Sequence, residues 1–187
     1  MRRSIGATLR NFCLATALIC AVLATAVSLP ASRGEAQAQT VRIVALGASN
    51  TRGFGVSPSE SYPAQLQGLL KAKGIDAAIA NSGMDGDTTG GMLARLSSAV
   101  PAGTQIVILQ PGTNDQRIGA GGERAGNIAE IWSRLIARKI GLIVIENEML
   151  DAVPTSERQP DGIHLTPEGY ARLAASILPT VLTAIGR

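Results

Sequence analysis

From Val41 onward, apolar and polar positions follow two alternating patterns along the chain. Nearly continuous apolar runs rich in Val, Ile and Leu are typical of parallel strands covered on both faces. Four such runs are predicted strands: Val41–Leu46, Ala77–Ala80, Gln105–Leu109 and Leu142–Glu146. Apolar residues at helical spacing predict helices between and after them: Tyr62–Lys73, Thr88–Ala99, Glu123–Lys139 and Glu168–Ile185. This order predicts an α/β fold with a doubly wound parallel sheet and right-handed crossovers.

The third predicted helix carries an apolar stripe that includes the chain's one tryptophan. The stripe consists of Ile128, Ile131, Trp132, Leu135 and Ile136. Trp132 is therefore interpreted as a core residue rather than as a platform for a ligand.

The beginning of the chain has the features of a secretory signal peptide. Three arginines precede an apolar run from Phe12 to Leu29, and Ala36-Gln37-Ala38 fits a cleavage site. We therefore predict a signal peptide over residues 1–38 and one domain over residues 39–187, exported to the periplasm or secreted. An uncleaved membrane anchor is the alternative, since the apolar run is near the shortest length that spans a bilayer.

The predicted leader also explains the basic character of the chain. Four of the 17 Lys and Arg residues and one of the 14 Asp and Glu residues precede Gln39, so the rest carries 13 of each sign. No basic domain is left to predict a nucleic-acid partner. Both cysteines, Cys13 and Cys20, lie in the leader and His164 is the one histidine, which excludes a Cys/His zinc site in the domain.

Small and polar residues follow each predicted strand. In a doubly wound sheet, ligands bind in the crevice at the carboxyl ends of the strands. The segments that reach this crevice are Gly47–Gly55, Asn81–Thr89, Pro111–Asp115 and Asp161–Leu165. The glycine-rich first segment has neither dinucleotide-binding nor P-loop spacing.

These segments carry the groups that acyl transfer requires. A serine hydroxyl needs an adjacent base, and the base needs a carboxylate that fixes its tautomer. Ser49 is the predicted nucleophile, His164 the base and Asp161 its orienting group. The predicted oxyanion hole consists of the Ser49 and Gly86 backbone N–H groups and the Asn114 side chain.

Two acidic residues near these groups have simpler interpretations. Asp87 is interpreted as the N-terminal cap of the helix that starts near Thr88. Asp115 is interpreted as part of an Asx turn that caps the segment after it.

Four sequence blocks together resemble the SGNH (GDSL-like) hydrolase family, and within it small secreted bacterial thioesterases, lysophospholipases and arylesterases. The blocks are Gly47–Ser49, Asn81–Thr88, Gly112–Asp115 and Asp161–His164. The resemblance implies a flavodoxin-like sheet, the same nucleophile, base and oxyanion donors, and no metal or organic cofactor.

The chain departs from the family pattern at two places. Ala48 stands where the family usually has an acidic residue that braces the nucleophile loop. Only a short segment joins the fourth strand to Asp161, so we expect four strands without the family's usual fifth. The acyl pocket should then be more open and suit short or varied acyl chains.

The sequence thus predicts a serine hydrolase that acts on a small-molecule ester or thioester. A carbohydrate deacetylase and a non-catalytic exported binding module are the alternatives on the same fold. Contact with a membrane is expected only through an uncleaved leader, and no oligomeric state is predicted.

Overall fold

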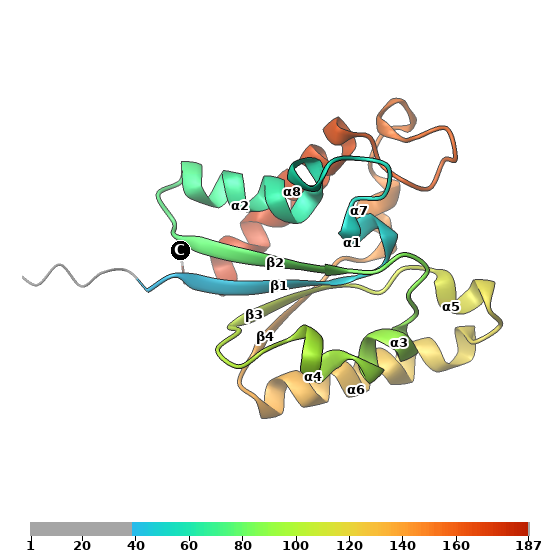
Figure 1. Cartoon of the computed structure of the whole chain (residues 1–187), viewed down its shortest axis with the longest axis horizontal. Coiled ribbons are helices and arrows are strands. Elements are labelled where there is room, and N and C mark those ends of the chain that lie inside the picture. The colour runs from blue at the N-terminus through green and yellow to red at the C-terminus, as the bar shows by residue number, and fades with distance from the viewer. Residues whose placement is uncertain (1–38, 187) are drawn as a thin grey trace, which may run out of the picture. The chain divides into compact units, whose positions relative to one another are not determined.

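A sheet of four parallel strands lies at the centre of the molecule (Figure 1). The structure, a computed structural model, describes residues 39–186, so the predicted signal peptide lies outside the described residues. The strands are β1 (Val41–Gly47), β2 (Ala77–Gly83), β3 (Ile106–Gln110) and β4 (Gly141–Val144). Their order is β2-β1-β3-β4, and each neighbouring pair is parallel. The predicted four-stranded doubly wound α/β fold is confirmed.

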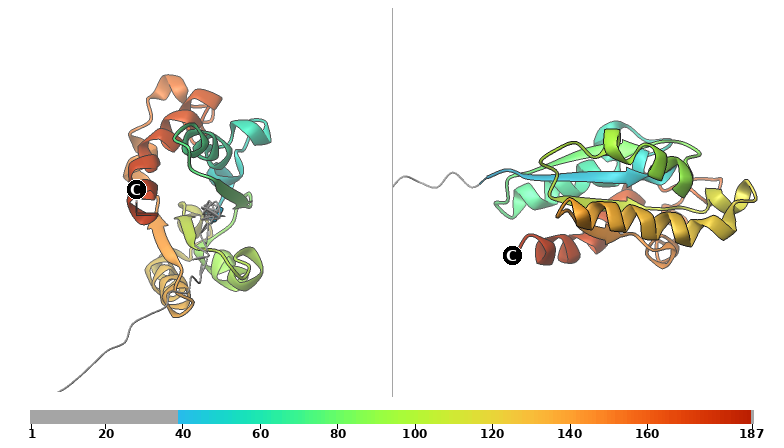
Figure 2. Two further views of the ribbon diagram at one scale, coloured as in Figure 1. Left: turned by 90° about the vertical axis from the view of Figure 1, so that its left-hand side faces the viewer. Right: turned by 90° about the horizontal axis from the view of Figure 1, so that it is seen from below.

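Helices cover both faces of the sheet, as the views in Figures 1 and 2 show. Ile43 and Ala45 of β1 belong to the apolar core on one face, whereas Val44 and Leu46 belong to the core on the other. This two-sided burial explains the nearly continuous apolar runs. The first face is covered by α2 (Tyr62–Ala72) and α8 (Pro167–Ala184), the second by α3 (Thr89–Ala94), α4 (Leu96–Ala99) and α6 (Arg124–Ala137).

Short helices follow three of the strands at their carboxyl ends (Figure 1). They are α1 (Ser49–Arg52) after β1, α5 (Asn114–Arg117) after β3 and α7 (Asn147–Asp151) after β4. One-turn 3-10 helices span Pro58–Glu60, Gly121–Glu123 and Thr155–Glu157. These elements surround the region in which the sequence places its polar blocks.

Two features differ from the sequence predictions. The helix expected over Thr88–Ala99 is two helices, because Arg95 leaves the helical conformation between α3 and α4 (φ −96°, ψ 8°). Trp132 is 55% exposed, so its interpretation as a core residue is wrong. Only Ile131 and Leu135 of α6 are buried, and Trp132 lies about 100° around the helix from Ile131, beyond the face that meets the sheet.

The segment between β4 and the C-terminal helix contains no fifth strand. It holds α7, a 3-10 helix and one isolated antiparallel bridge between Arg158 and Leu165. Across residues 39–186, none of the helices combines the length and the apolar character needed to cross a membrane.

Candidate active site

Ser49 is the first residue of α1, directly after β1. A side chain at Gly47 would collide with Thr51 Oγ1, so glycine is needed for α1 to pack against the end of β1. Gly53 ends α1 in the left-handed conformation, at φ +83°. The turn places the half-buried Ser49 at the carboxyl end of the sheet, beside the crevice in which such folds bind ligands.

Asp161, His164 and Ser49 form a continuous chain of hydrogen bonds. His164 Nε2 lies 2.9 Å from Ser49 Oγ, and His164 Nδ1 lies 2.6 Å from Asp161 Oδ2. The structure therefore brings the three predicted residues together although 115 positions separate Ser49 from His164. This is the geometry that a serine, its base and the orienting carboxylate require.

The turn that carries the base is built by Asp161 itself. Its Oδ1 accepts the N–H groups of Ile163 at 2.8 Å and His164 at 2.9 Å, and Gly162 adopts φ +70°. The hydrogen bond with the imidazole, followed by these two backbone donors, lowers the pKa of Asp161 to about 2. Asp161 is therefore ionised at neutral pH and can orient the His164 ring.

Side chains on both sides of this turn hold it to the rest of the molecule. Gln159 Nε2 donates to the carbonyls of Phe54 at 2.7 Å and Leu165 at 2.8 Å, which ties the base segment to the segment after α1. The Arg158 guanidinium donates to the carbonyls of Leu150, Val153 and Gly162. These contacts replace the support that a neighbouring strand would supply.

The imidazole also stacks on an aromatic ring. The ring centroids of Phe54 and His164 are 4.3 Å apart, with 28° between their planes. The His164 side chain is left only 13% exposed. Stacking thus restricts the rotation of the ring that contacts Ser49.

The predicted oxyanion donors lie on three segments. A hydrogen bond joins the segment that carries Asn114 to the segment that carries Gly86. Asn114 Nδ2 donates to the Asp87 carbonyl at 2.8 Å, which uses one of its two hydrogens. Gly86, next to Asp87, adopts φ +72°. Within residues 39–186 the N–H groups of Ser49 and Gly86 have no acceptor in the protein. Each of the three groups thus retains an N–H for a substrate oxygen.

Both simpler interpretations of the acidic residues are wrong. Thr88, not Asp87, caps α3, with its hydroxyl accepting the Gly91 N–H, and Asp87 instead pairs with Arg95. Asp115 is 1% exposed and reaches across to Thr89, accepting its hydroxyl at 2.5 Å and its N–H at 3.1 Å. Both carboxylates connect the loop after β2 to other elements, and such long-range contacts are not visible in local sequence patterns.

Two further polar residues support the nucleophile turn and were not singled out from the sequence. Gln110 Oε1 lies 3.3 Å from both the Ala48 N–H and the Thr51 hydroxyl. Asn50 Oδ1 accepts the hydroxyl of Tyr170 at 3.1 Å, and burial raises the pKa of Tyr170 to about 12. The position of Asn50 directly after the nucleophile was the available signal.

A cavity of about 240 Å³ opens beside the nucleophile. Its walls come from the segments after β1, β3 and β4, and they include Ser49 and Asn114 but not Gly86. Leu150 and Ile163 are apolar, and the other side chains on the wall after β4 are polar or charged. The cavity therefore offers a small pocket of mixed character next to Ser49.

The hydrogen-bonded Ser49, His164 and Asp161 at the carboxyl edge of a parallel sheet are the arrangement typical of serine hydrolases. Residues 45–159 match the model of the GDSL-like Lipase/Acylhydrolase family, and the chain belongs to this family. The predicted SGNH-type hydrolase is thereby confirmed at the level of the family. The match ends before Asp161, so the base turn is placed by the structure alone.

The chain is also similar to individual proteins. It is 33% identical over 75 residues to an arylesterase of Vibrio mimicus and 35% identical over 85 residues to the esterase TesA of Pseudomonas aeruginosa. These stretches cover 40% and 43% of this chain, and only 38% and 40% of those proteins. A crystal structure of TesA superposes with a TM-score of 0.70 at 22% identity, covering 76% of this chain and 99% of that one, which shows the shared fold.

Proposed function

We propose that this protein is an exported serine hydrolase that cleaves carboxylic esters or thioesters through an acyl-enzyme on Ser49. The observation that carries the proposal is the chain of contacts from Asp161 through His164 to Ser49, at 2.6 and 2.9 Å. A hydroxyl held this close to an oriented imidazole can lose its proton as it attacks a carbonyl.

In the proposed reaction, Ser49 Oγ bonds to the carbonyl carbon while His164 Nε2 takes the hydroxyl proton. The resulting oxyanion accepts hydrogen bonds from the Ser49 and Gly86 N–H groups and from Asn114. When the bond to the leaving group breaks, the imidazolium returns the proton to the departing oxygen or sulfur. Water then loses a proton to His164 as it attacks the acyl carbon. The bond between that carbon and Ser49 Oγ breaks, the imidazolium returns the proton to Ser49 Oγ, and the acid is released.

The pocket supports short or varied acyl chains. Its volume of about 240 Å³ is small, and the short segment after β4 provides one wall without an additional strand. A long fatty acyl chain would extend past this wall into solvent. We therefore expect turnover to rise little beyond short acyl chains.

Export is proposed from the amino-terminal sequence alone. Three arginines, the apolar run Phe12–Leu29 and the Ala36-Gln37-Ala38 site support cleavage after residue 38. The intact mass of the protein recovered from the medium or periplasm tests this. Recovery of the chain in the membrane fraction with residues 1–38 retained would favour the membrane-anchor alternative.

The lining of the pocket favours carbohydrate deacetylation as a second candidate. The lining includes side chains with hydrogen-bonding groups that suit hydroxyl-rich substrates: Asn114, Arg117, Asn147, Asp151 and Arg158. Release of acetate from acetylated sugars, faster than from aryl acetates at equal concentration, would identify this activity.

Hydrolysis of aryl acetates and short acyl thioesters by wild-type protein and by Ser49→Ala tests the proposal. We expect measurable turnover by wild type and none above background by the variant. The Arg134→Met variant, altered at an exposed ion pair on α6, serves as the control and should retain full activity. If wild type shows no turnover above Ser49→Ala on any of these substrates, the non-catalytic binding module replaces the proposal.

A further inference from the structure

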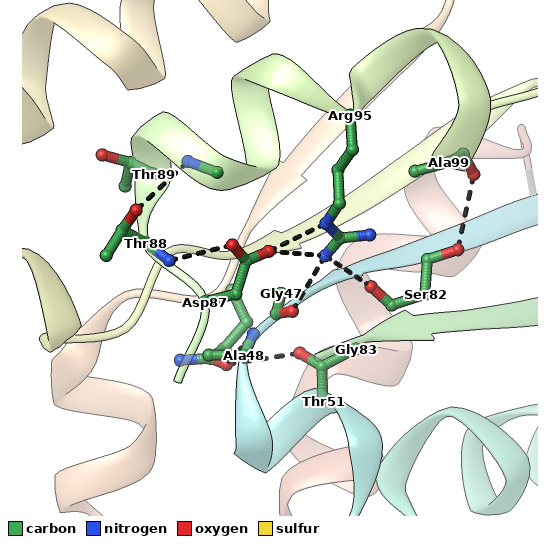
Figure 3. A network of polar contacts seen from close by, with 12 residues as sticks. Gly47, Ala48, Thr51, Ser82, Gly83, Asp87, Thr88, Thr89, Arg95 and Ala99 are labelled. Carbon is green, nitrogen blue, oxygen red and sulfur yellow. Dashed lines mark hydrogen bonds and ion pairs between the residues drawn. The ribbon is translucent and has the colours of Figure 1, made fainter. Parts of the chain in front are cut away.

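Arg95 lies next to the carboxyl ends of β1 and β2, at the break between α3 and α4, and its side chain points toward Gly47 and Ser82 (Figure 3). Its guanidinium pairs with Asp87 at 2.8 Å and donates through Nη2 to the carbonyls of Ser82 at 2.8 Å and Gly47 at 3.2 Å. The side chains of Arg95 and Asp87 are only 19% and 10% exposed. One largely buried cation thus joins two strand ends and a loop.

The loop after β2 is shaped around this pair. Asp87 Oδ1 accepts the N–H of Thr88 at 3.0 Å, while Oδ2 faces Arg95. A Cβ at Gly91 would collide with the Asp87 carboxylate, so the backbone of α3 leaves room for it. Because a guanidinium presents its donors in a fixed planar fork, the pair sets the direction of its partners as well as their distance.

The partners of the pair belong to both halves of the candidate site. Gly47 lies two residues before Ser49, and its carbonyl also accepts the Met84 N–H at 3.0 Å. Asp87 follows Gly86, and its own carbonyl accepts Asn114 Nδ2 at 2.8 Å. The contacts therefore run without interruption from the strand that carries the nucleophile to two of the three proposed oxyanion donors.

The residue before the nucleophile supplies no comparable contact. Ala48 is the N-cap of α1 and makes no side-chain hydrogen bond, so the turn is held by its backbone and by neighbouring side chains. The contact between Arg95 and the Gly47 carbonyl therefore matters more for the position of Ser49 relative to the oxyanion donors.

We propose that Arg95, through its ion pair with Asp87, is a positioning residue that holds the Ser49 turn in register with Gly86 and Asn114. The proposal rests on the proposed serine hydrolase function. Arg95 touches neither Ser49 nor the base, so its effect on the reaction is indirect. It aligns the donors with the oxyanion that forms in the transition state, and substrate binding does not depend on it.

The test compares steady-state hydrolysis of an aryl acetate by wild type, Arg95→Met, Arg95→Lys and Asp87→Asn. We expect Arg95→Met to lower kcat by about 10- to 100-fold with KM unchanged within about twofold, as for small misplacements of reacting groups. Arg95→Lys keeps the charge but not the planar fork, so its loss should be intermediate. Arg134→Met removes an exposed Arg–carboxylate pair and is the matched control.

A double variant separates positioning from a general structural effect. If Arg95 acts through the oxyanion donors, Arg95→Met should cost less in an Asn114→Ala background than in wild type, because the donor it aligns is already gone. Where Arg95→Met does not fold, Arg95→Lys and Asp87→Asn decide by the same criteria.

Three results would overturn the inference. The first is a kcat within twofold of wild type in the folded variants, and the second is a change confined to KM. The third is a fold-loss of kcat in the double variant that equals the product of the losses caused by Arg95→Met and Asn114→Ala alone. Absence of turnover by wild type would remove the proposed function itself. Activity that depends on Ser49 but not on Arg95 would remove this inference alone.

Discussion

The loop after β2 carries Gly86 and the segment after β4 carries Asp161 and His164, and different kinds of contact hold these two walls of the site. The β2 loop is fixed by charged groups with little exposure, since Asp115 is 1% and the Asp87 side chain 10% exposed. The base segment is held by the Gln159 and Arg158 side chains, which donate to backbone carbonyls, and by an Asp161 side chain that is 38% exposed. One wall thus depends on charged groups with little exposure, whereas the turn in the other is partly exposed to solvent.

This difference indicates where each wall is vulnerable. When one member of a buried charged pair is removed, the other stays buried with neither a partner nor water to bind. Changes in the β2 loop should therefore reduce stability as well as activity. Changes in the exposed base turn should act almost entirely on the reaction. The following predictions test this contrast.

The largest effect is expected at His164, in the segment after β4. His164→Ala removes the proposed base for Ser49 and should lower kcat on the order of 10⁴-fold or more, with the midpoint of thermal unfolding nearly unchanged. Stopped-flow or steady-state hydrolysis of an aryl acetate measures the first quantity, and calorimetry the second. Retention of more than about one hundredth of wild-type kcat would assign the base to another group.

A smaller loss of kcat is expected at Asn114, the proposed oxyanion donor on the segment after β3. Asn114→Ala removes one donor and should lower kcat by about 10²- to 10³-fold while KM changes little. The comparison with His164→Ala on the same substrate gives the relative weight of the proposed base and of this oxyanion donor. An increase in KM at constant kcat would instead make Asn114 a substrate-binding residue.

Asp115→Asn should affect stability more than chemistry. The amide carries no charge, and its NH2 group replaces one of the two carboxylate oxygens that accept from Thr89. The weakened contacts should cost about 1–3 kcal/mol of the free energy of unfolding. Urea denaturation measures this loss. Asp151→Asn, at an exposed position, is the control and should match wild type. Equal stability of Asp115→Asn and wild type would contradict the contrast between the walls.

The smallest effect concerns acid pH. The pKa of Asp161 is lowered to about 2 in the folded protein, so its ionised form contributes stability above its ordinary pKa of 3.8. That contribution is lost as the pH falls through the folded pKa. Between these values wild type should lose slightly more stability than Asp161→Asn, as thermal unfolding measured across that range would show. Parallel curves would contradict the lowered pKa of Asp161.

The sequence predicted those strands and helices in which apolar residues recur at a regular spacing. Burial on both faces makes the central strands β1 and β3 largely apolar, and polar blocks follow the strands, so the sheet and the proximity of Ser49, Asp161 and His164 could be expected. Trp132 was misplaced because helical periodicity marks an apolar stripe without giving the width of the buried face.

The supports of the site could not be predicted in the same way. Asp115 meets Thr89 across 26 positions, Arg95 meets Gly47 across 48 and Gln110 meets Thr51 across 59. These contacts depend on how segments far apart in the sequence pack together. A local motif identifies the reactive groups, whereas the residues that hold them in place emerge only from the tertiary structure.

Labelling with a fluorophosphonate probe, followed by peptide mapping, shows which residue is the nucleophile. We expect one modified residue, Ser49, with the label abolished in Ser49→Ala and strongly slowed in His164→Ala. Modification at any other residue, or labelling of Ser49 at an unchanged rate in His164→Ala, would contradict this expectation.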